Sequence, residues 1–299
     1  MAAEKIKNQP ALKEHRKLLK PRKVSRSFGG NFAVFTVLFI MGLFMVVPLV
    51  YVVMNAFKPL EELLLFPPRF FVTRPTIQNF IDLFNLMDET WVPFSRYIFN
   101  TVFITVVTTI GHVLLSSMAA FVLSKHKFFG SKMIFKIIVL SLMFSGAVTG
   151  VPNYLTLASF RMIDTPWAII VPAVQSSLGL YLMKQFMDNV NDSLLESARI
   201  DGANEFKVYW SIMMPQVKPA WLTLIILQIQ GLWSLSSDFL MSEQNKTLSM
   251  AMTLIVNGGV ARMGAASAVG LVMMIVPITT FIFTQSRIIE TMSASGIKE

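Results

Sequence analysis

The chain has 299 residues, of which 54% are hydrophobic and only 14% carry a charged side chain. Soluble domains usually carry about 25% charged residues, so this composition excludes a disordered chain and argues against an ordinary soluble fold. The absence of cysteine excludes disulfides, thiolate metal ligands and a cysteine nucleophile. The histidines at 15, 112 and 126 are scattered, and we expect neither a metal site nor a catalytic centre.

Charged residues are missing from six long stretches of the sequence. Each stretch has at least 18 residues without Asp, Glu, Lys or Arg, and about 20 apolar residues cross a bilayer as a helix. We therefore predict an all-α integral membrane protein with six transmembrane helices. They fall near Phe32–Met54, Tyr97–Ser124, Ile137–Phe160, Thr165–Met183, Pro219–Ser237 and Met263–Ser286. A shorter stretch, 247–261, is predicted to be a surface or re-entrant segment.

Basic residues are distributed unevenly over the segments between these spans. With the N-terminus in the cytoplasm, nineteen Lys and Arg lie on the inner side and seven on the outer side, in agreement with the positive-inside rule. Both termini are then cytoplasmic. The chain divides into a basic tail (1–27), a six-span domain (28–286) with an outside loop (58–96), and a C-terminal tail (287–299). The basic tail favours anionic lipid of the inner leaflet over nucleic acid as a partner.

Two predicted spans contain residues that interrupt helices. The third contains Gly150 and Pro152, and in the fourth Pro172 and Gly179 flank the polar run 175–177. Freed carbonyls need polar partners in a membrane, so such breaks line protein or water-filled cavities. Helix packing and a pathway for a polar solute are both open as interpretations. His112, within the second span, is either a hydrogen-bonded packing residue or a proton relay.

The segment 191–220 is too polar for a span and lies on the inner side. Asp192 is predicted to cap a first short helix, which Gly202 ends in a left-handed conformation. Asn204 then caps a second helix that reaches about Met213. We name residues 191–215 the finger. Its surface mixes charged and apolar side chains, so it either docks on another protein or folds back on its own helices.

The finger carries a spacing typical of a known family. Its pattern is Glu-Ser-Ala, three residues, Gly, nine residues, Ile, one residue, Met-Pro. This resembles the loop of ABC importer permeases that begins with Glu-Ala-Ala, called the EAA loop, and every spacing agrees. Ser197 replaces an Ala and Met214 a Leu, and Asp201-Gly202-Ala203 matches the usual Asp-Gly-Ala.

Other motifs are similar to those of the carbohydrate branch of this family. They are Asn100-Thr101, Pro152 with Tyr154, Thr247-Leu248, and the tail 290–299, whose ending resembles the Gly-x-Lys-Gly of the maltose-type second permease. The resemblance covers about 28–299. It implies a type I ABC importer permease fold in a bacterial inner or plasma membrane.

The resemblance also implies how this subunit works. The implied role is that of a non-catalytic subunit that translocates a carbohydrate, such as an oligosaccharide or a polysaccharide fragment, and whose EAA loop docks on a separate ATPase dimer. The chain has no phosphate-binding loop, so ATP and Mg²⁺ would be bound by that partner. The other implied partners are a second permease and an extracytoplasmic solute-binding protein. The residues assigned to coupling are Glu196, Ser197, Ala198, Asp201, Gly202, Ala203, Ile212 and Pro215.

Polar residues near the interrupted spans are the candidates for the solute pathway. They are Tyr154, Gln175, Ser176 and Asp238. Three alternatives to a sugar permease are open: an ABC permease for another polar solute, a proton-coupled secondary transporter and an integral membrane enzyme. A secondary transporter would need a buried acid, for which only Asp238 is close to a span. An enzyme would need clustered histidines and acids at one membrane face.

Overall fold

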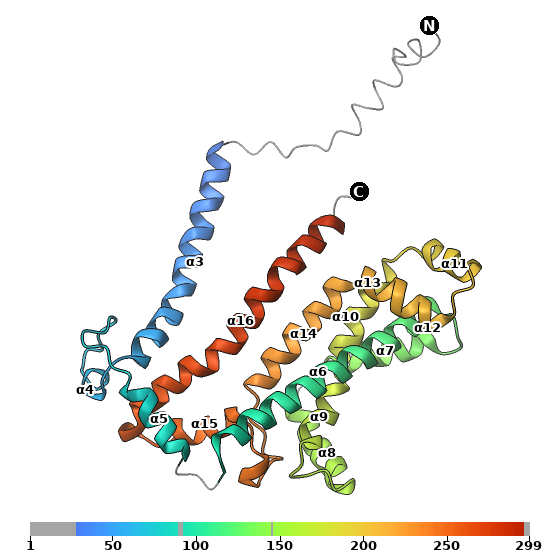
Figure 1. Cartoon of the computed structure of the whole chain (residues 1–299). Coiled ribbons are helices and arrows are strands. Elements are labelled where there is room, and N and C mark those ends of the chain that lie inside the picture. The colour runs from blue at the N-terminus through green and yellow to red at the C-terminus, as the bar shows by residue number, and fades with distance from the viewer. Residues whose placement is uncertain (1–27, 89–91, 145, 296–299) are drawn as a thin grey trace. The chain divides into compact units, whose positions relative to one another are not determined.

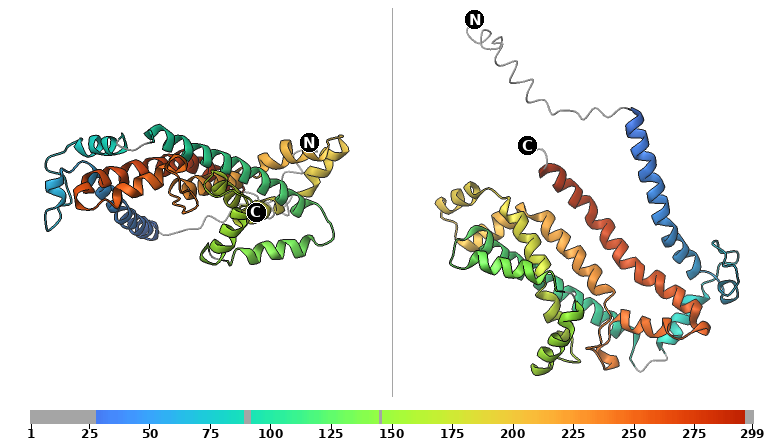
Figure 2. Two further views of the ribbon diagram at one scale, coloured as in Figure 1. Left: turned by 90° about the horizontal axis from the view of Figure 1, so that it is seen from below. Right: turned by 180° about the vertical axis from the view of Figure 1, so that it is seen from behind.

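The computed structural model describes residues 28–88, 92–144 and 146–295, and over these residues all regular structure is helical. The predicted N-terminal tail (1–27) and the last residues of the C-terminal tail lie outside this description. The chain forms two compact units that divide after Tyr51. The first described helix, α3 (Phe28–Ala56), is apolar along its whole length and crosses this division. The other elements belong to the second unit (Figures 1 and 2).

Three helices are long and apolar enough to cross a membrane by themselves. They are α3, α6 (Phe94–Lys125) and α16 (Met263–Ser295), and they match the first, second and sixth predicted spans. The fifth predicted span is α14 (Lys218–Trp233), which forms one apolar stretch with the preceding Glu205–Gln216 across a 78° bend. The described helices therefore give three spans, or four if the bent pair is one span.

The third and fourth predicted spans are each divided into two helices. The third forms α7 (Ser131–Ser141) and α8 (Gly146–Ser159), and the fourth forms α9 (Trp167–Val174) and α10 (Ser177–Asp188). The predicted interruptions are therefore confirmed. Neither proline lies at the break itself, because Pro152 is inside α8 and Pro172 is inside α9.

The remaining elements of the second unit are short. The predicted outside loop (58–96) contains α4 (Leu60–Leu63) and α5 (Gln78–Asp88). The stretch 247–261 begins with α15 (Leu248–Val256). Leu248, Met252 and Ile255 of α15 are buried in a core with α5 and α16. Of the two predicted alternatives, the surface segment is therefore wrong for this helix, because its apolar residues recur at helical spacing and pack inward, and the re-entrant segment stays a prediction.

Helix α6 passes through all three apolar cores of the second unit, and it packs on α9, α10, α14 and α15. Its burial pattern is the reverse of that in a soluble helix. The exposed side chains are large and apolar, as at Phe99, Phe103 and Ile110. Most of the buried side chains are small or polar, namely Asn100, Thr101, Thr105, Thr108, Thr109, His112, Ser116 and Ser117, beside the larger Tyr97, Ile104 and Phe121. This pattern is typical of a membrane helix, in which small polar residues allow close packing between helices.

Candidate functional site

The first helix of the finger, α11 (Asp192–Ile200), is capped at both ends by its own sequence. The side chain of Asn191 accepts a hydrogen bond from the backbone N–H of Ser193 at 3.1 Å, so Asn191 is the N-cap. The prediction of Asp192 as the cap is wrong by one residue. At the other end Gly202 has φ +83°, as predicted. The N–H groups of Gly202 and Ala203 bond to the carbonyls of Arg199 and Ala198, each at 3.0 Å, which is a Schellman motif.

The second part of the finger begins at Asn204, as predicted. Its side chain accepts a hydrogen bond from the N–H of Lys207 at 2.8 Å. One turn of α-helix, α12 (Glu205–Lys207), leads into a π-helical stretch, Val208–Met213, and then α13 (Met214–Gln216). The wide π turn was not predicted. Such turns are frequent at functional sites.

One face of the finger is buried and the other is open. Leu195, Val208 and Met213 pack into a core with Phe121 of α6 and Met187 of α10. On the opposite face three large apolar side chains are exposed: Ile200 (86%), Phe206 (68%) and Trp210 (51%). Both alternatives left by the sequence are thus partly correct, since the finger folds back on its own helices and still presents an apolar surface.

The two halves of the finger are joined by an ion pair. Nε and Nη2 of Arg199 donate to the two carboxylate oxygens of Glu205, at 2.7 and 3.1 Å. Nε2 of His126, in the α6–α7 loop, lies 3.3 Å from the same carboxylate. The hydrogen bond from Arg199 is the main cause that lowers the pKa of Glu205.

Polar contacts also tie the finger to the end of α6. Nζ of Lys125 donates to the carbonyl of Val190 and to the carboxylate of Asp192, both at 2.6 Å. The hydrogen bond between Lys125 and the Asp192 carboxylate is the main cause that lowers the pKa of Asp192. Deeper in the core the hydroxyls of Ser117 and Tyr209 are 2.6 Å apart. Sequence analysis missed Lys125 and Ser117, because their partners are 67 and 92 residues away.

The residues of the EAA pattern lie around the turn of the finger and along its open face. Exposed members are Glu196, Ser197, Asp201, Gly202 and Pro215, and partly buried members are Ala198, Ala203 and Ile212. The hydroxyl of Ser197 bonds back to the carbonyl of Ser193 at 2.8 Å, so it competes little for an external partner.

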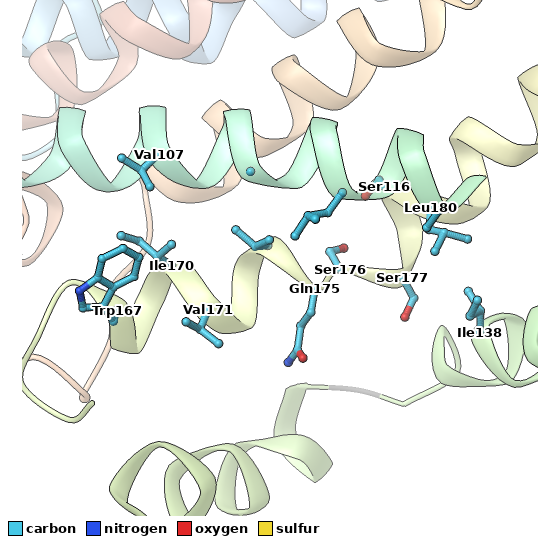
Figure 3. Close-up of a pocket in the computed structure, with 14 residues that line it drawn as sticks. Val107, Ser116, Ile138, Trp167, Ile170, Val171, Gln175, Ser176, Ser177 and Leu180 are labelled. Atoms are coloured by element: carbon cyan, nitrogen blue, oxygen red, sulfur yellow. The ribbon is translucent and has the colours of Figure 1, made fainter. Parts of the chain in front are cut away.

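A cavity of about 640 Å³ lies at the break between α9 and α10 (Figure 3). Most of its lining is apolar and comes from α6, α7, α9 and α10. Its polar groups are Ser116 and the predicted residues Gln175 and Ser176, together with Ser177. In Figure 3 the amide of Gln175 points away from α6. This amide is exposed and makes no hydrogen bond within the described part of the chain.

The other two predicted pathway residues lie elsewhere. The ring of Tyr154 packs on Phe239 with centroids 6.1 Å apart, and Asp238 lines a separate cavity of about 320 Å³ with Lys246 and Met241. Asp164, in the loop between α8 and α9, ties this loop to the segment that follows Asp238. Its carboxylate accepts hydrogen bonds from the N–H groups of Met241 and Ser242, at 2.9 and 2.8 Å. The structure therefore divides the four candidates into two pairs.

His112 is a hydrogen-bonded packing residue, which is one of its two interpretations. Its Nδ1 lies 2.8 Å from the carbonyl of Val174, the last residue of α9. No acidic side chain of the described residues is recorded in contact with it. Across the described ranges no three His, Asp or Glu side chains are placed to hold a metal ion.

Comparison with known proteins gives the family. The model of the family described as "binding-protein-dependent transport system inner membrane component" matches residues 25–292. The chain belongs to this family. It is therefore a multi-pass permease of the inner membrane, and the transmembrane subunit rather than the ATPase of its transporter.

Several individual proteins are similar to this chain. The polygalacturonan/rhamnogalacturonan transport system permease YtcP of Bacillus subtilis is 28% identical over 66% of each chain. The arabinooligosaccharides transport system permease AraQ of Halalkalibacterium halodurans is 27% identical over 85% of this chain and 91% of its own. A solved bacterial ABC transporter involved in the import of alginate superimposes with a TM-score of 0.72. It has 18% identity and covers 88% of this chain and 98% of that one, which supports the permease fold.

Proposed function

We propose that this permease subunit takes part in the uptake of an oligosaccharide or a polysaccharide fragment. Relatives named for the transport of polygalacturonan/rhamnogalacturonan and of arabinooligosaccharides support this substrate class, as does the fold shared with a subunit of an alginate importer. By this proposal a second permease completes the pathway, and an extracytoplasmic binding protein delivers the sugar. Import of another polar solute would use the same machinery.

The finger is the part of this subunit that docks on the ATPase. The observation that carries this assignment is its open face, where the EAA residues Glu196 and Asp201 stand beside exposed Ile200 and Phe206. An apolar patch rimmed by charges is typical of a protein interface. ATP and Mg²⁺ belong to the ATPase dimer, whose closure would push on the finger and shift the permease between its two access states.

The solute passes along the break between α9 and α10. In a bilayer an exposed amide without a protein partner is costly next to lipid, so it faces water, solute or a polar protein surface. Gln175 is such a group, and Ser176 lines the same cavity. Tyr154 and Asp238 would then stand nearer the outer end of the route.

The coupling proposal is tested with two substitutions in the finger. Gly202→Val places a β-branched residue at φ +83°, which costs about 1–2 kcal/mol and misdirects the turn. Glu196→Lys reverses an exposed charge of the docking face. Both variants are expected in the membrane at wild-type level, with loss of bound ATPase subunit or of solute-stimulated hydrolysis.

The matched control is Ser197→Ala, which introduces the residue usual at this position of the pattern. This variant should retain both the bound ATPase subunit and the stimulation of ATP hydrolysis by solute. Purified complexes are compared for bound ATPase and for ATP hydrolysis with and without loaded binding protein. Wild-type values for both Gly202→Val and Glu196→Lys would refute the docking assignment.

A further inference from the structure

The break between α9 and α10 leaves backbone carbonyls without helical partners. Helix α9 ends at Val174, and Ser176 has ψ 119°, which is not helical. The last carbonyls of a helix have no intrahelical donor. In a membrane they need another one, because no bulk water is present. The structure shows where two of these carbonyls find their donors.

Two side chains from different helices reach these carbonyls. Nδ1 of His112, on α6, lies 2.8 Å from the carbonyl oxygen of Val174. Nε2 of Gln228, on α14, donates to the carbonyl of Ala173 at 3.1 Å. Because a carbonyl only accepts, the proton of the neutral imidazole is on Nδ1. The broken end of α9 is thus hydrogen-bonded on two sides.

The start of α10 is shaped to leave room for this imidazole. A Cβ on Gly179 would lie 2.0 Å from Nε2 of His112 and 2.5 Å from its Cε1. Only glycine allows α10 to approach the ring so closely. Two residues earlier, the hydroxyl of Ser177 lies 2.6 Å from that of Ser141 on α7. Both sides of the break are therefore fixed by neighbouring helices.

We propose that His112 and Gln228 are positioning residues that hold this break open and thereby keep Gln175 and Ser176 at the wall of the solute route. This inference rests on the proposed function only in one respect, namely that the solute passes along the break. The held geometry itself stands on the two hydrogen bonds and on the close approach at Gly179. Neither side chain lies at the break in sequence, since they are 62 and 55 residues from their partners.

The test uses the absence of cysteine from the chain. Ser176→Cys supplies a single thiol at the break, and a membrane-impermeant, quaternary-ammonium methanethiosulfonate reports its exposure to water in the assembled transporter. In this background His112→Leu keeps bulk but removes the donor, whereas His112→Asn keeps a donor at the position of Nδ1. Gln228→Met is the equivalent donor-free variant on α14.

The labelling rate is expected to change roughly 2- to 13-fold in His112→Leu and in Gln228→Met. This range corresponds to the net contribution of one hydrogen bond, about 0.5–1.5 kcal/mol, to the preference for the held state. His112→Asn is expected to restore the wild-type rate. The matched control is Thr108→Val, one turn earlier on α6. Thr108 is fully buried and its hydroxyl has no partner among the described residues, so its removal should leave labelling unchanged.

Two results would overturn the inference. Wild-type labelling in both donor-free variants would show that the hydrogen bonds do not hold the break. Normal labelling in His112→Leu with altered labelling in His112→Asn would show that the ring acts by its volume. If His112→Leu does not assemble with the ATPase, Gln228→Met decides the question alone.

The same variants separate this inference from the proposed function. Uptake of the sugar bound by the partner binding protein is measured in parallel, in chains that retain Ser176. A shifted labelling rate with a raised half-saturation concentration and an unchanged maximal rate supports both. A shifted labelling rate with unchanged uptake keeps the positioning role and rejects the break as the solute route.

Discussion

Glu205 joins the two halves of the finger through its ion pair with Arg199, and its carboxylate also contacts His126 of the α6–α7 loop. The lowered pKa of its carboxyl group means that the ionised form is favoured in the folded finger. The ion pair therefore stabilises the finger at pH values above the ordinary glutamate pKa of about 4.3. This contribution is lost as the pH falls through the lower pKa that Glu205 has in the folded finger.

We predict that Glu205→Gln loosens the finger at neutral pH by about 0.3–1 kcal/mol, a small value because the pair is partly exposed to solvent. Hydrogen exchange of the finger, corrected for intrinsic rates, should be faster than in the wild type at pH 7. In acid, where Glu205 becomes protonated, the corrected exchange rate of the wild type should approach that of the variant. The control is Asp201→Asn, which removes an exposed carboxylate that has no side-chain partner among the described residues. Equal exchange in wild type and Glu205→Gln at pH 7 would contradict the prediction.

Gln175 and Ser176 are the pathway residues that the structure places in one cavity. Replacing both with Leu removes the polar groups from this wall; Leu is close to Gln175 in size and larger than Ser176. We predict a several-fold loss of uptake with normal assembly of the transporter, because a sugar needs hydrogen-bonding groups along its route. Uptake kinetics in membrane vesicles measure the effect, and kinetics equal to the wild type would remove these two residues from the route.

Which residue contacts were predictable depends on their range along the chain. The left-handed Gly202 and the cap at Asn204 follow from local backbone chemistry, and both are confirmed. The first cap was misplaced because Asn191 and Asp192 are adjacent and chemically equivalent as caps. The partner of His112 could not be predicted, since Val174 is 62 residues away and only the packing of α6 on α9 brings them together.

At the scale of elements, α6 links the finger to the opposite end of the second unit. Lys125 and Ser117 bind the finger near the C-terminal end of α6. Near its N-terminal end Asn100 donates to the carbonyls of Gln244 and Lys246, at 2.8 and 3.0 Å. An unbroken helix held at both ends is suited to carry a movement of the finger along its length.

We predict that Lys125→Met weakens this link while the docking face stays intact. The buried ammonium group would no longer bind Asp192 and the carbonyl of Val190. Solute-stimulated ATP hydrolysis should fall roughly 3- to 10-fold, which corresponds to about 1 kcal/mol, with normal binding of the ATPase subunit. The control is Lys184→Met, whose partner Asp188 is on the same helix. A loss of stimulation equal in both variants would argue against a specific role of α6.

The helices themselves were largely predictable because composition alone shows where apolar stretches begin and end. The long helices α3, α6 and α16 follow from this signal. The exact breaks do not, because proline is tolerated inside α8 and α9 while the chain opens at positions with ordinary residues. Packing against neighbouring helices, which supply donors to the freed carbonyls, decides where a membrane helix can break.

At the scale of the whole molecule, six crossings require that each broken helix pair spans the bilayer once. Helix α9 has 8 residues and α10 has 12. At a rise of 1.5 Å per residue they are together about 30 Å long, which equals the apolar thickness of a bilayer. The pair α7 and α8, with 11 and 14 residues, is longer. The lengths of both pairs are therefore sufficient for one crossing each, as six crossings require.

We predict this topology, and the absence of native cysteine makes it measurable with single thiols. Asp82→Cys, in α5 of the outside loop, should react with an impermeant maleimide in intact cells. Ser211→Cys, on the exposed face of the finger, should react only after the membrane is opened, because the positive-inside bias places the finger in the cytoplasm. A reporter fused after Glu299 should likewise be active only inside. A reporter at Glu299 that is active only outside would show that the predicted six-span topology is wrong. A finger thiol that reacts from outside would show in addition that the finger cannot dock on a cytoplasmic ATPase.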